Sequence, residues 1–251
     1  SDGNATITGA DVDGGSTDNC SVASVTVDQT SFDCSSVGSN TVTLTVTDQS
    51  GNSSTCTADV TVEDNVAPNA VCQNITAQLD ANGNATITGA DVDGGSTDNC
   101  AIASLSVTPD MFDCSDVGTT QTVTLTVTDV NGNSSTCTAN VEVEDNIAPT
   151  AVCQDITVYL NSSGLVFVTA ADIDGGSSDN CGVASVTTDA FVYGCGNVGP
   201  NTATLTVTDV NGNVSTCTAN IEVEDTIPPT PICQDVTISL DANGNASVGP
   251  F

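Results

Sequence analysis

The sequence contains no lysine, no arginine and no histidine. Its 251 residues include 32 aspartate and glutamate residues, so the formal net charge at neutral pH is −32. Such a chain repels nucleic-acid phosphates and anionic membrane surfaces, and it attracts cations wherever its carboxylates converge. We therefore expect no nucleic-acid partner, and we expect a metal cation to bind.

The missing basic residues also argue against catalysis. Without them the chain has no imidazole base, no amine nucleophile and no guanidinium group to clamp a substrate. Two carboxylates alone can hydrolyse glycosides, but such enzymes need a shaped cleft, commonly lined by aromatic side chains. The chain has no tryptophan, two tyrosines and five phenylalanines. The sequence therefore predicts that this protein is not an enzyme.

No stretch approaches the roughly 20 apolar residues that a membrane helix needs, and no secretory leader begins at Ser1. We expect no membrane insertion and interpret the sequence as a mature or excerpted product. Its acidity does not indicate disorder, because hydrophobic residues make up 38% of the chain and alternate with polar ones in runs such as TVTLTVTD and ANVEVED. This alternation predicts a folded β protein.

Cysteine is abundant, at twelve residues. An even number in a chain poor in aromatic residues indicates a disulfide framework formed in an oxidising compartment. A structural zinc site would more often use CxxC pairs or histidine, and neither occurs here. The expected location is extracellular or on the cell surface.

The chain is built from repeats. The run GNATITGADVDGGSTDNC at Gly3 to Cys20 recurs unchanged at Gly83 to Cys100 and in altered form ending at Cys181, which gives a period of 80 to 81 residues. Every cysteine follows this period, in the sets Cys20, Cys100 and Cys181; Cys34, Cys114 and Cys195; Cys56, Cys137 and Cys217; and Cys72, Cys153 and Cys233.

The period predicts four segments. Repeat 1 (residues 1–64) lacks its first strand, repeat 2 (65–145) and repeat 3 (146–225) are whole, and the C-terminal segment (226–251) is the first strand of a fourth repeat, completed by the following repeat or by the next copy. The junctions VEDNVAPNA, VEDNIAPTA and VEDTIPPTP contain prolines that stiffen the passage between repeats.

Short alternating runs separated by turn residues indicate strands, with little room for a helix. In repeat 2 we expect strands near Val71–Leu79, Ala85–Thr88, Ile102–Thr108, Thr122–Thr128 and Thr136–Glu144. About seven short strands in roughly 80 residues are typical of an immunoglobulin-like sandwich. The predicted fold class is all-β: tandem immunoglobulin-like β-sandwich repeats that form an extended rod.

Several motifs resemble those of the hyalin-repeat family: the start AVCQDITV, the DNC-x-VAS step, the stretch from Phe112 to Thr120 and the ending TVTDVNGNSSTCTANVEV. The resemblance covers nearly the whole chain. It implies immunoglobulin-like modules of extracellular and cell-surface proteins, arranged in tandem and linked to adhesion. The additional pair Cys100 and Cys114 departs from that family's two-cysteine pattern.

Two kinds of disulfide are expected. The first-strand cysteine of a sandwich should meet the last-strand cysteine, which pairs Cys72 with Cys137 and Cys153 with Cys217. The cysteines close in sequence should close a loop, which pairs Cys20 with Cys34, Cys100 with Cys114 and Cys181 with Cys195.

Cys56 and Cys233 remain without a partner. Either the chain is cropped from a longer array, or the trailing strand of one copy completes the leading sandwich of the next. The tail SVGPF differs from the TITGA expected there, which keeps the second possibility open.

Carboxylates converge most densely on the loop DVDGGSTDN, and hard oxygen ligands on a glycine-turned loop are suited to calcium. In an immunoglobulin-like sandwich this loop, the turn before the last strand and the entering linker share one end. The linker VEDNVAP resembles the calcium-coordinating linker between cadherin repeats. The predicted calcium ligands are Asp11, Asp13, Asp18, Asp48, Glu63, Asp64, Asn65, Asp91, Asp93, Asp98, Asp129, Glu144, Asp145, Asn146, Asp172, Asp174, Asp179, Asp209, Glu224 and Asp225. The alternative is that these residues only form turns and face water.

Threonines alternate along one expected strand of each repeat, as at Thr122, Thr124, Thr126 and Thr128. Such a hydroxyl face could bind ice, a glycan or a neighbouring strand, although threonine is also a good strand former for any wetted face. The leading hypothesis is a structural component of an extracellular filament or surface fibre, with adjoining repeats or further copies as end-to-end partners. The alternatives are an adhesin that binds a glycan or a surface protein, and a passive spacer of a secreted enzyme.

Overall fold

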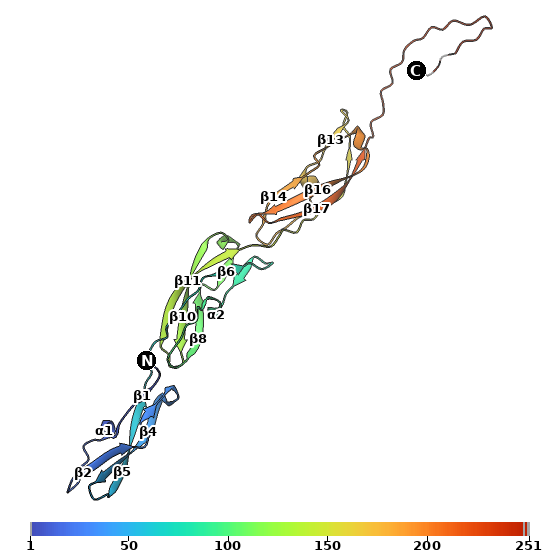
Figure 1. Cartoon of the computed structure of the whole chain (residues 1–251). Helices are drawn as coiled ribbons and strands as arrows, with labels where there is room; N and C mark the ends of the chain where they lie inside the picture. Colours follow the sequence, from blue (N-terminus) through green and yellow to red (C-terminus); the bar gives the residue numbers. More distant parts are fainter. Residues whose placement is uncertain (1, 248, 250–251) are drawn as a thin grey trace. The chain divides into compact units, whose positions relative to one another are not determined.

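A computed structural model describes residues 2–247 and 249. Of the tail SVGPF, Val248, Pro250 and Phe251 lie outside the described residues. The chain forms two compact units, Ser1–Ile147 and Ala148–Phe251, and each is described by itself. The first unit contains repeats 1 and 2, and the second contains most of repeat 3 and the C-terminal segment (Figure 1).

Repeat 2 is a sandwich with one larger and one smaller sheet. Its elements are β6 (Ile75–Gln78), β7 (Asn84–Thr86), α2 (Gly89–Val92), β8 (Ile102–Thr108), β9 (Met111–Asp113), the 3-10 turn η2 (Cys114–Asp116), β10 (Thr120–Asp129) and β11 (Ser134–Glu144). The larger sheet has four strands in the order β6-β11-β10-β8, and β7 pairs with β9 in the smaller sheet. Strand β6 runs parallel to β11, and the other pairs are antiparallel.

The core of repeat 2 follows from the alternation of its long strands. Val123, Leu125 and Val127 of β10 are fully buried, and the threonines between them lie on the opposite, exposed or half-buried face. Phe112 of β9 closes the core from the smaller sheet, where its exposed fraction is 4%. The prediction that the threonines share one sheet face is therefore confirmed.

Repeat 1 has the same plan with one strand fewer. Its elements are β1 (Ala5–Thr6), α1 (Gly9–Val12), β2 (Val22–Val27), β3 (Ser31–Phe32), η1 (Cys34–Ser36), β4 (Gly38–Asp48) and β5 (Ser53–Val62). Strand β1 pairs with β3, and the larger sheet has three strands in the order β2-β4-β5. Among the described residues, the outer edge of β5 therefore lacks the parallel neighbour that β6 gives to β11.

The second unit holds the third sandwich. Its elements are β12 (Ile156–Tyr159), β13 (Leu165–Phe167), α3 (Ala170–Ile173), β14 (Val183–Thr188), β15 (Val192–Gly194), η3 (Cys195–Asn197), β16 (Gly199–Asp209) and β17 (Val214–Glu224). The larger sheet again has four strands, in the order β12-β17-β16-β14. Its core joins Leu205 and Val207 of β16 to Ile221 and Val223 of β17 and to Tyr193 of the smaller sheet.

Each predicted strand of repeat 2 has a counterpart, with shorter first and second strands and longer last ones. The all-β class and the immunoglobulin-like sandwich plan are confirmed. The sequence missed β9 and the short helices α1, α2 and α3, which have four residues each. Among the described residues, no helix has the length and apolar character needed to cross a membrane.

The disulfides confirm one kind of prediction and correct the other. Cys72 is bonded to Cys137 and Cys153 to Cys217, each with 5.8 Å between the Cα atoms, so the predicted link between first and last strands is right. Cys34, however, is bonded to Cys100 of the following repeat, with 5.3 Å between the Cα atoms. The predicted pairs Cys20–Cys34 and Cys100–Cys114 are therefore wrong.

The reason is the length of the strand that separates the paired positions. Cys100 precedes β8 and Cys114 follows β9, and the seven residues of β8 cover about 23 Å at roughly 3.3 Å per residue. Cys114 lies at the far end of the sandwich, where its sulfur is 3.7 Å from the carbonyl oxygen of Gly83. Cys20 and Cys195 are free and exposed, so the predicted pair Cys181–Cys195 is wrong as well.

Candidate metal centre

The centre is assembled from three turns at one end of repeat 2. The first is the DNC turn, where Oδ2 of Asp98 accepts hydrogen bonds from the backbone N–H groups of Cys100 (2.8 Å) and Ala101 (3.1 Å). These bonds occupy Oδ2 and turn the other oxygen, Oδ1, inward. Asp98 Oδ1 is buried and has no hydrogen-bond partner.

The second is the DVNGN turn between β10 and β11. Asp129 is 2% exposed, and its Oδ1 accepts from the backbone N–H groups of Asn131 (2.9 Å) and Asn133 (2.8 Å). Its Oδ2 accepts from the Asn133 side-chain amide at 2.8 Å. Burial acts to raise the pKa of Asp129, but the hydrogen bonds from Asn133 and Asn131 outweigh it and leave the pKa below its usual value. Asp129 is therefore held as a buried carboxylate.

The third is the linker that enters repeat 2. The backbone carbonyl of Asp64 accepts from the Asn133 side-chain amide at 2.9 Å, so the turn that holds Asp129 also anchors the linker. Asp64 Oδ1 accepts from the Asn99 side-chain amide at 3.2 Å. Asp64 Oδ2 and Asn99 Oδ1 are buried without a hydrogen-bond partner.

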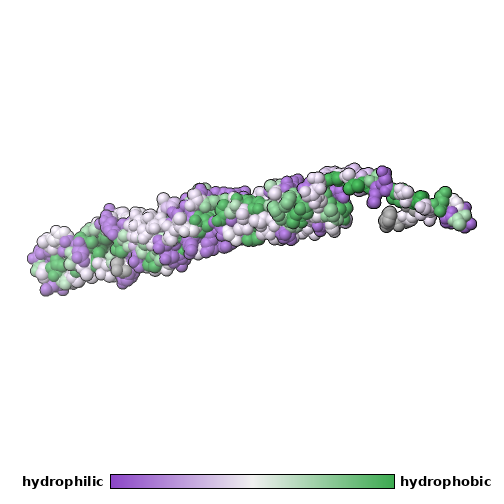
Figure 2. Space-filling model, turned by 90° about the horizontal axis from the view of Figure 1, so that it is seen from above, coloured by the Kyte–Doolittle hydropathy of each residue, from purple (hydrophilic) through white to green (hydrophobic). Residues whose placement is uncertain are grey.

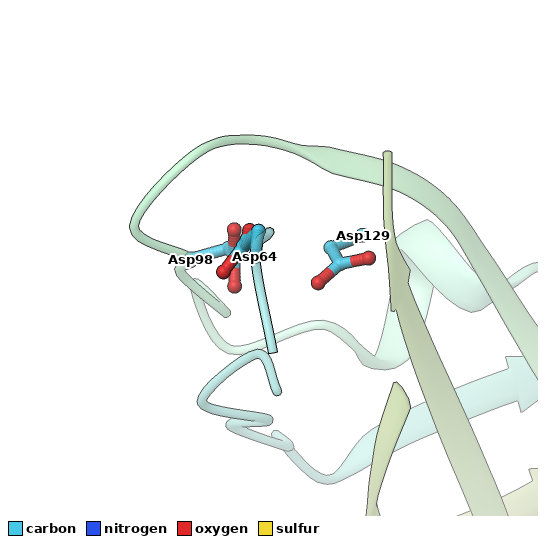
Figure 3. Close-up of side chains that lie close together, drawn as sticks. All are labelled: Asp64, Asp98 and Asp129. Atoms are coloured by element: carbon cyan, nitrogen blue, oxygen red, sulfur yellow. The ribbon is translucent and has the colours of Figure 1, made fainter. Parts of the chain in front are cut away.

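These turns bring three carboxylates together. Asp64, Asp98 and Asp129 each offer one oxygen, and those oxygens lie within 4.8 Å of one another (Figure 3). The three carboxylates carry like charges, and one oxygen atom of each of Asp64, Asp98 and Asn99 is buried without a hydrogen-bond partner. The chain has no basic side chain to neutralise these charges. Buried acceptors without donors are costly unless a cation satisfies them. The all-oxygen donor set fits a hard cation.

Other predicted ligands of the same loop lie elsewhere. Asp91 Oδ2 accepts from the backbone N–H and the hydroxyl of Thr88, both at 2.6 Å, and thereby caps α2. Asp93 Oδ1 accepts from the backbone N–H (2.9 Å) and the hydroxyl (2.6 Å) of Ser96. These hydrogen bonds lower the pKa of both aspartates. The structure gives Asp91 and Asp93 turn-forming roles, and it does not bring them into the cluster.

Glu63 and Asn65, on either side of Asp64, also stay outside the cluster. The Asn65 side-chain amide donates to Glu63 Oε2 at 3.2 Å. Glu144 Oε2 accepts from the side-chain amides of Gln78 (2.8 Å) and Asn146 (3.1 Å), which lowers the Glu144 pKa. Glu63 and Asn65 are exposed, whereas Asp64 between them is half-buried.

Repeats 1 and 3 preserve the local turns. In repeat 1, Asp18 accepts from Cys20 N–H and Asp48 from the Asn52 backbone and side chain, while Asp11 binds Thr8 and Asp13 binds Ser16. In the second unit, Asp179 and Asp209 repeat the bonds of Asp98 and Asp129, while Asp172 binds Thr169 and Asp174 binds Ser177.

Asp145 and Asp225 occupy the positions equivalent to Asp64. Their Oδ1 atoms accept from the backbone N–H groups of Ile147 (3.2 Å) and Ile227 (3.0 Å), as Asp64 Oδ1 does from Val66. Glu224 lies beside Asp225 at the exposed end of β17.

Sequence reasoning missed Asn133, which holds both Asp129 and the Asp64 carbonyl. The signal was available, because the asparagine of the DVNGN turn recurs at Asn213 and, in the DQSGN turn of equal length, at Asn52.

The cluster lies beside the disulfide that joins repeats 1 and 2. Cys100 is two residues from Asp98, and the Cys34 sulfur lies 3.5 Å from the carbonyl oxygen of Asn99. Gly3 packs against the Cys34–Cys100 disulfide with φ of +73°, and a Cβ there would lie 2.8 Å from the Cys34 sulfur. One junction thus carries both a covalent link and a group of converging acceptors.

No family model and no curated protein matches this sequence. Among solved structures, the chain is similar to protocadherin gamma B7 extracellular cadherin domains 1–4, with 12% identity, 76% of this chain and 59% of that chain covered, and a TM-score of 0.33. It is also similar to Drosophila N-cadherin EC1-4 (13% identity, 74% and 57% covered, TM-score 0.34).

A further similar structure is human protocadherin-24 EC1-2 (15% identity, 64% and 100% covered, TM-score 0.35). The chain thus spans less than two thirds of the length of the protocadherin gamma B7 and N-cadherin chains. The hyalin-repeat resemblance has no family match behind it and remains an interpretation of the motifs.

Proposed function

We propose that this chain is a structural component of an extracellular filament or surface fibre, in which calcium and disulfides hold successive immunoglobulin-like repeats end to end. The observation that carries the proposal is the Cys34–Cys100 bond, which links two successive repeats covalently. A disulfide within one sandwich stabilises that sandwich alone. A disulfide between sandwiches passes load from one to the next, which is the requirement of a mechanical element.

The disulfides Cys34–Cys100, Cys72–Cys137 and Cys153–Cys217 support an oxidising, extracellular location. The scarcity of catalytic residue types supports a non-enzymatic role, because the chain has no histidine, lysine or arginine. The close similarity of repeats 1 and 2 favours a structural role over a specific binding site, since a binding site would make one repeat distinct from the others.

Calcium is the cation that best suits the cluster. The three carboxylates and the orphaned Asn99 oxygen are hard ligands, and calcium accepts six to eight such oxygens in flexible arrangements. When bound, the ion would supply the positive charge that the chain lacks, while Asp64, Asp98 and Asp129 would hold it between the linker and the two turns of repeat 2. We extend the same assignment to the equivalent positions of the other junctions.

Isothermal titration of the oxidised full chain with calcium tests this assignment. We expect Asp98→Asn to weaken binding at one junction by about tenfold or more, because the cluster loses one charge. Asp93→Asn serves as the matched control, since Asp93 lies in the same loop but bonds Ser96, and it should leave the calcium affinity unchanged. Equal affinities in the wild type and Asp98→Asn would contradict the metal site.

Electron microscopy of the native material tests the filament itself. Long uniform fibres with an axial repeat set by the sandwiches are expected. Isolated short particles in the native material would overturn the structural role and favour an adhesin or a spacer.

A further inference from the structure

The smaller sheet of repeat 3 carries an apolar surface. The apolar patch consists of Leu165, Phe167, Phe191 and Val192, whose exposed fractions are 39%, 56%, 58% and 50%. These residues lie in β13, in β15 and directly before β15. Figure 2 shows hydrophobic residues on the surface of the third sandwich. Single exposed apolar residues are ordinary, but a contiguous group of them marks a contact surface.

The patch is contiguous because the two strands bring its members together. Phe167 of β13 pairs with Val192 of β15. Tyr193, next to Val192, is buried, so the alternation of the strands turns Val192, Phe167 and Leu165 outward. The ring of Phe191 meets that of Phe167 edge to face, with 5.5 Å between the ring centroids.

Repeats 1 and 2 have mostly polar residues at the patch positions. The equivalents of Leu165, Phe167, Phe191 and Val192 are Asn84, Thr86, Asp110 and Met111 in repeat 2 and Asn4, Thr6, Thr30 and Ser31 in repeat 1. One backbone hydrogen bond is common to the three sandwiches: the carbonyls of Thr30, Asp110 and Phe191 accept from the N–H groups of Ile7, Ile87 and Val168 at 2.9, 2.9 and 3.0 Å. The apolar patch is therefore a change of side chains on a shared backbone.

Charge is absent from the same region. In repeat 2 the smaller sheet and its flanking turns, residues 80–86 and 110–116, contain the aspartates Asp80, Asp110, Asp113 and Asp116. Repeat 3 has Asn161, Phe191, Gly194 and Asn197 at these positions, so its equivalent segments, 161–167 and 191–197, hold no charged residue. Leu165 Cδ2 lies 3.4 Å from the position of a Cβ at Gly194, so the glycine leaves room for the leucine side chain.

The loss of charge distinguishes between two kinds of partner. A basic protein surface would bind better to a face that keeps its carboxylates, because opposite charges attract across an interface. An acidic partner is repelled by carboxylates, and their absence removes that repulsion. A second copy of this chain is such an acidic partner, since it carries the same formal charge of −32.

We propose that the apolar patch of one copy packs against the apolar patch of a second copy, so that copies associate side by side through repeat 3. A contact between identical patches is self-complementary and closes about a two-fold axis. Phe167 and Phe191 of each copy bury their exposed ring surface against those of the other, in the edge-to-face arrangements that aromatic rings prefer. This contact rests on the proposed filament function, to which it adds lateral packing.

The contact between two isolated chains is weak. Four side chains that are about half exposed present less than the roughly 800 Å² per partner that a stable, specific interface buries. In a filament the same contact recurs along the fibre, and each contact that forms raises the effective concentration for the next. The patch thus suits bundling of filaments, and single chains associate only at high concentration.

Sedimentation equilibrium of the oxidised full chain in calcium tests the contact. The free thiols are first alkylated, so that only non-covalent association is measured. We expect reversible dimers whose fraction rises with protein concentration. Higher ionic strength should strengthen them, because screening reduces the repulsion between like-charged chains. A contact held by opposite charges would instead weaken.

Variants that install the residues of repeat 2 test the patch itself. Phe167→Thr with Phe191→Asp should weaken the dimer about tenfold or more, because the contact loses two aromatic rings and gains a charge. Leu165→Asn is a second, independent variant and should weaken it as well. Both leave buried residues untouched, so the melting temperature should not change. Met111→Ser, at a residue of repeat 2 that is 67% exposed, is the matched control and should leave the dimer unchanged.

Photocrosslinking locates the contact. A benzophenone side chain at position 191, in an equal mixture of ¹⁵N-labelled and unlabelled chains, should give crosslinked peptides that combine one labelled and one unlabelled partner. The partner peptide should contain β13 or β15.

Three outcomes would overturn the proposal. They are a chain that stays monomeric at its highest soluble concentration, dimers that the double variant leaves unchanged, and crosslinks from position 191 to elements other than β13 and β15 of the second copy. A monomeric chain would leave the patch to a partner of another kind. None of these outcomes bears on the calcium titration or on the native fibres, so failure of the lateral contact is distinguishable from failure of the proposed function.

Discussion

At the scale of single residues, the aspartates of the acidic loop in repeat 2 have different roles. In Asp91, Asp93 and Asp98 alike, one carboxylate oxygen accepts two local hydrogen bonds. The second oxygen of Asp98 differs, because it is buried without a hydrogen-bond partner and lies in the cluster with Asp64 and Asp129. Acidic residues of one loop thus serve two different purposes.

The hydrogen bonds of Asp93 predict that its contribution to the stability of the fold depends on pH. The hydrogen bonds from Ser96 lower its pKa in the folded state below the ordinary value of 3.8, so the unfolded chain binds more protons in that range. The stability that Asp93 contributes is therefore present above that pH and is lost as pH falls through the lower, folded pKa. Thermal unfolding of the wild type and Asp93→Asn in calcium-free buffer between pH 2 and 6 should show melting curves that converge below about pH 4.

The difference in melting temperature between the wild type and Asp93→Asn excludes the general loss of charge repulsion on protonation, because both chains share that loss. A difference in melting temperature that stays constant across this range would show that the Asp93 carboxylate does not contribute through its charge.

A second prediction concerns Gly3 beside the cross-repeat disulfide. Its φ of +73° disfavours any Cβ, and that Cβ would also meet the Asn99 carbonyl at 2.7 Å. Gly51 has φ of +89° but nothing within 4 Å of its Cβ position. Gly3→Ala should therefore lower the unfolding free energy by more than Gly51→Ala, which costs about 1 kcal/mol for the backbone conformation alone.

Chemical denaturation of both variants measures the two costs. If Gly3→Ala and Gly51→Ala lower the unfolding free energy equally, close packing of Gly3 against the Cys34–Cys100 disulfide contributes nothing to stability.

At the scale of elements, the sandwiches depend on the link between first and last strands. The short strand β6 is attached to the sheet by four residue pairs with β11 and by Cys72–Cys137, which closes a sequence separation of 65 residues. A repeat of this size has a small core, so a crosslink contributes a large share of its stability. The loop-entropy relation gives about 4 kcal/mol for a loop of this length.

Replacing Cys72 and Cys137 together by alanine should therefore lower the unfolding free energy of the first unit by up to about 4 kcal/mol. The same change at Cys153 and Cys217 is the matched comparison in the second unit, where the sequence separation is 64 residues. Hydrogen exchange read by mass spectrometry assigns the loss to a unit. If either double variant accelerates hydrogen exchange in both units, the two disulfides do not stabilise their units independently.

At the scale of the whole molecule, the charge of a single sign opposes the close approach of carboxylates. A formal charge of −32 without a single basic side chain leaves every carboxylate repelling every other. The repulsion is most concentrated where Asp64, Asp98 and Asp129 converge. Calcium in the proposed site would offset it locally, and salt screens the rest over roughly 8 to 10 Å at physiological ionic strength.

Chelation should therefore loosen the chain and lower its melting temperature. Small-angle scattering of the oxidised full chain should show a larger or less well-defined maximum dimension with chelator than with calcium. Magnesium at the same concentration controls for screening, since it demands a tighter octahedral site. An unchanged dimension together with an unchanged melting temperature would count against calcium at the junctions.

The sequence by itself determined what depends on local pattern and on the period: the repeats, most of the strands, the threonine face, the bond between first- and last-strand cysteines, and the residue types of the acidic end. These follow because alternation and turn residues act over a few positions, and because a repeated pattern must fold in a repeated way. Only the tertiary structure decided that Cys34 bonds Cys100 and that Asp98, rather than Asp91 or Asp93, faces Asp64. Both depend on which ends of different strands meet in space, and proximity in sequence misled the prediction because a full strand separates the neighbouring cysteines.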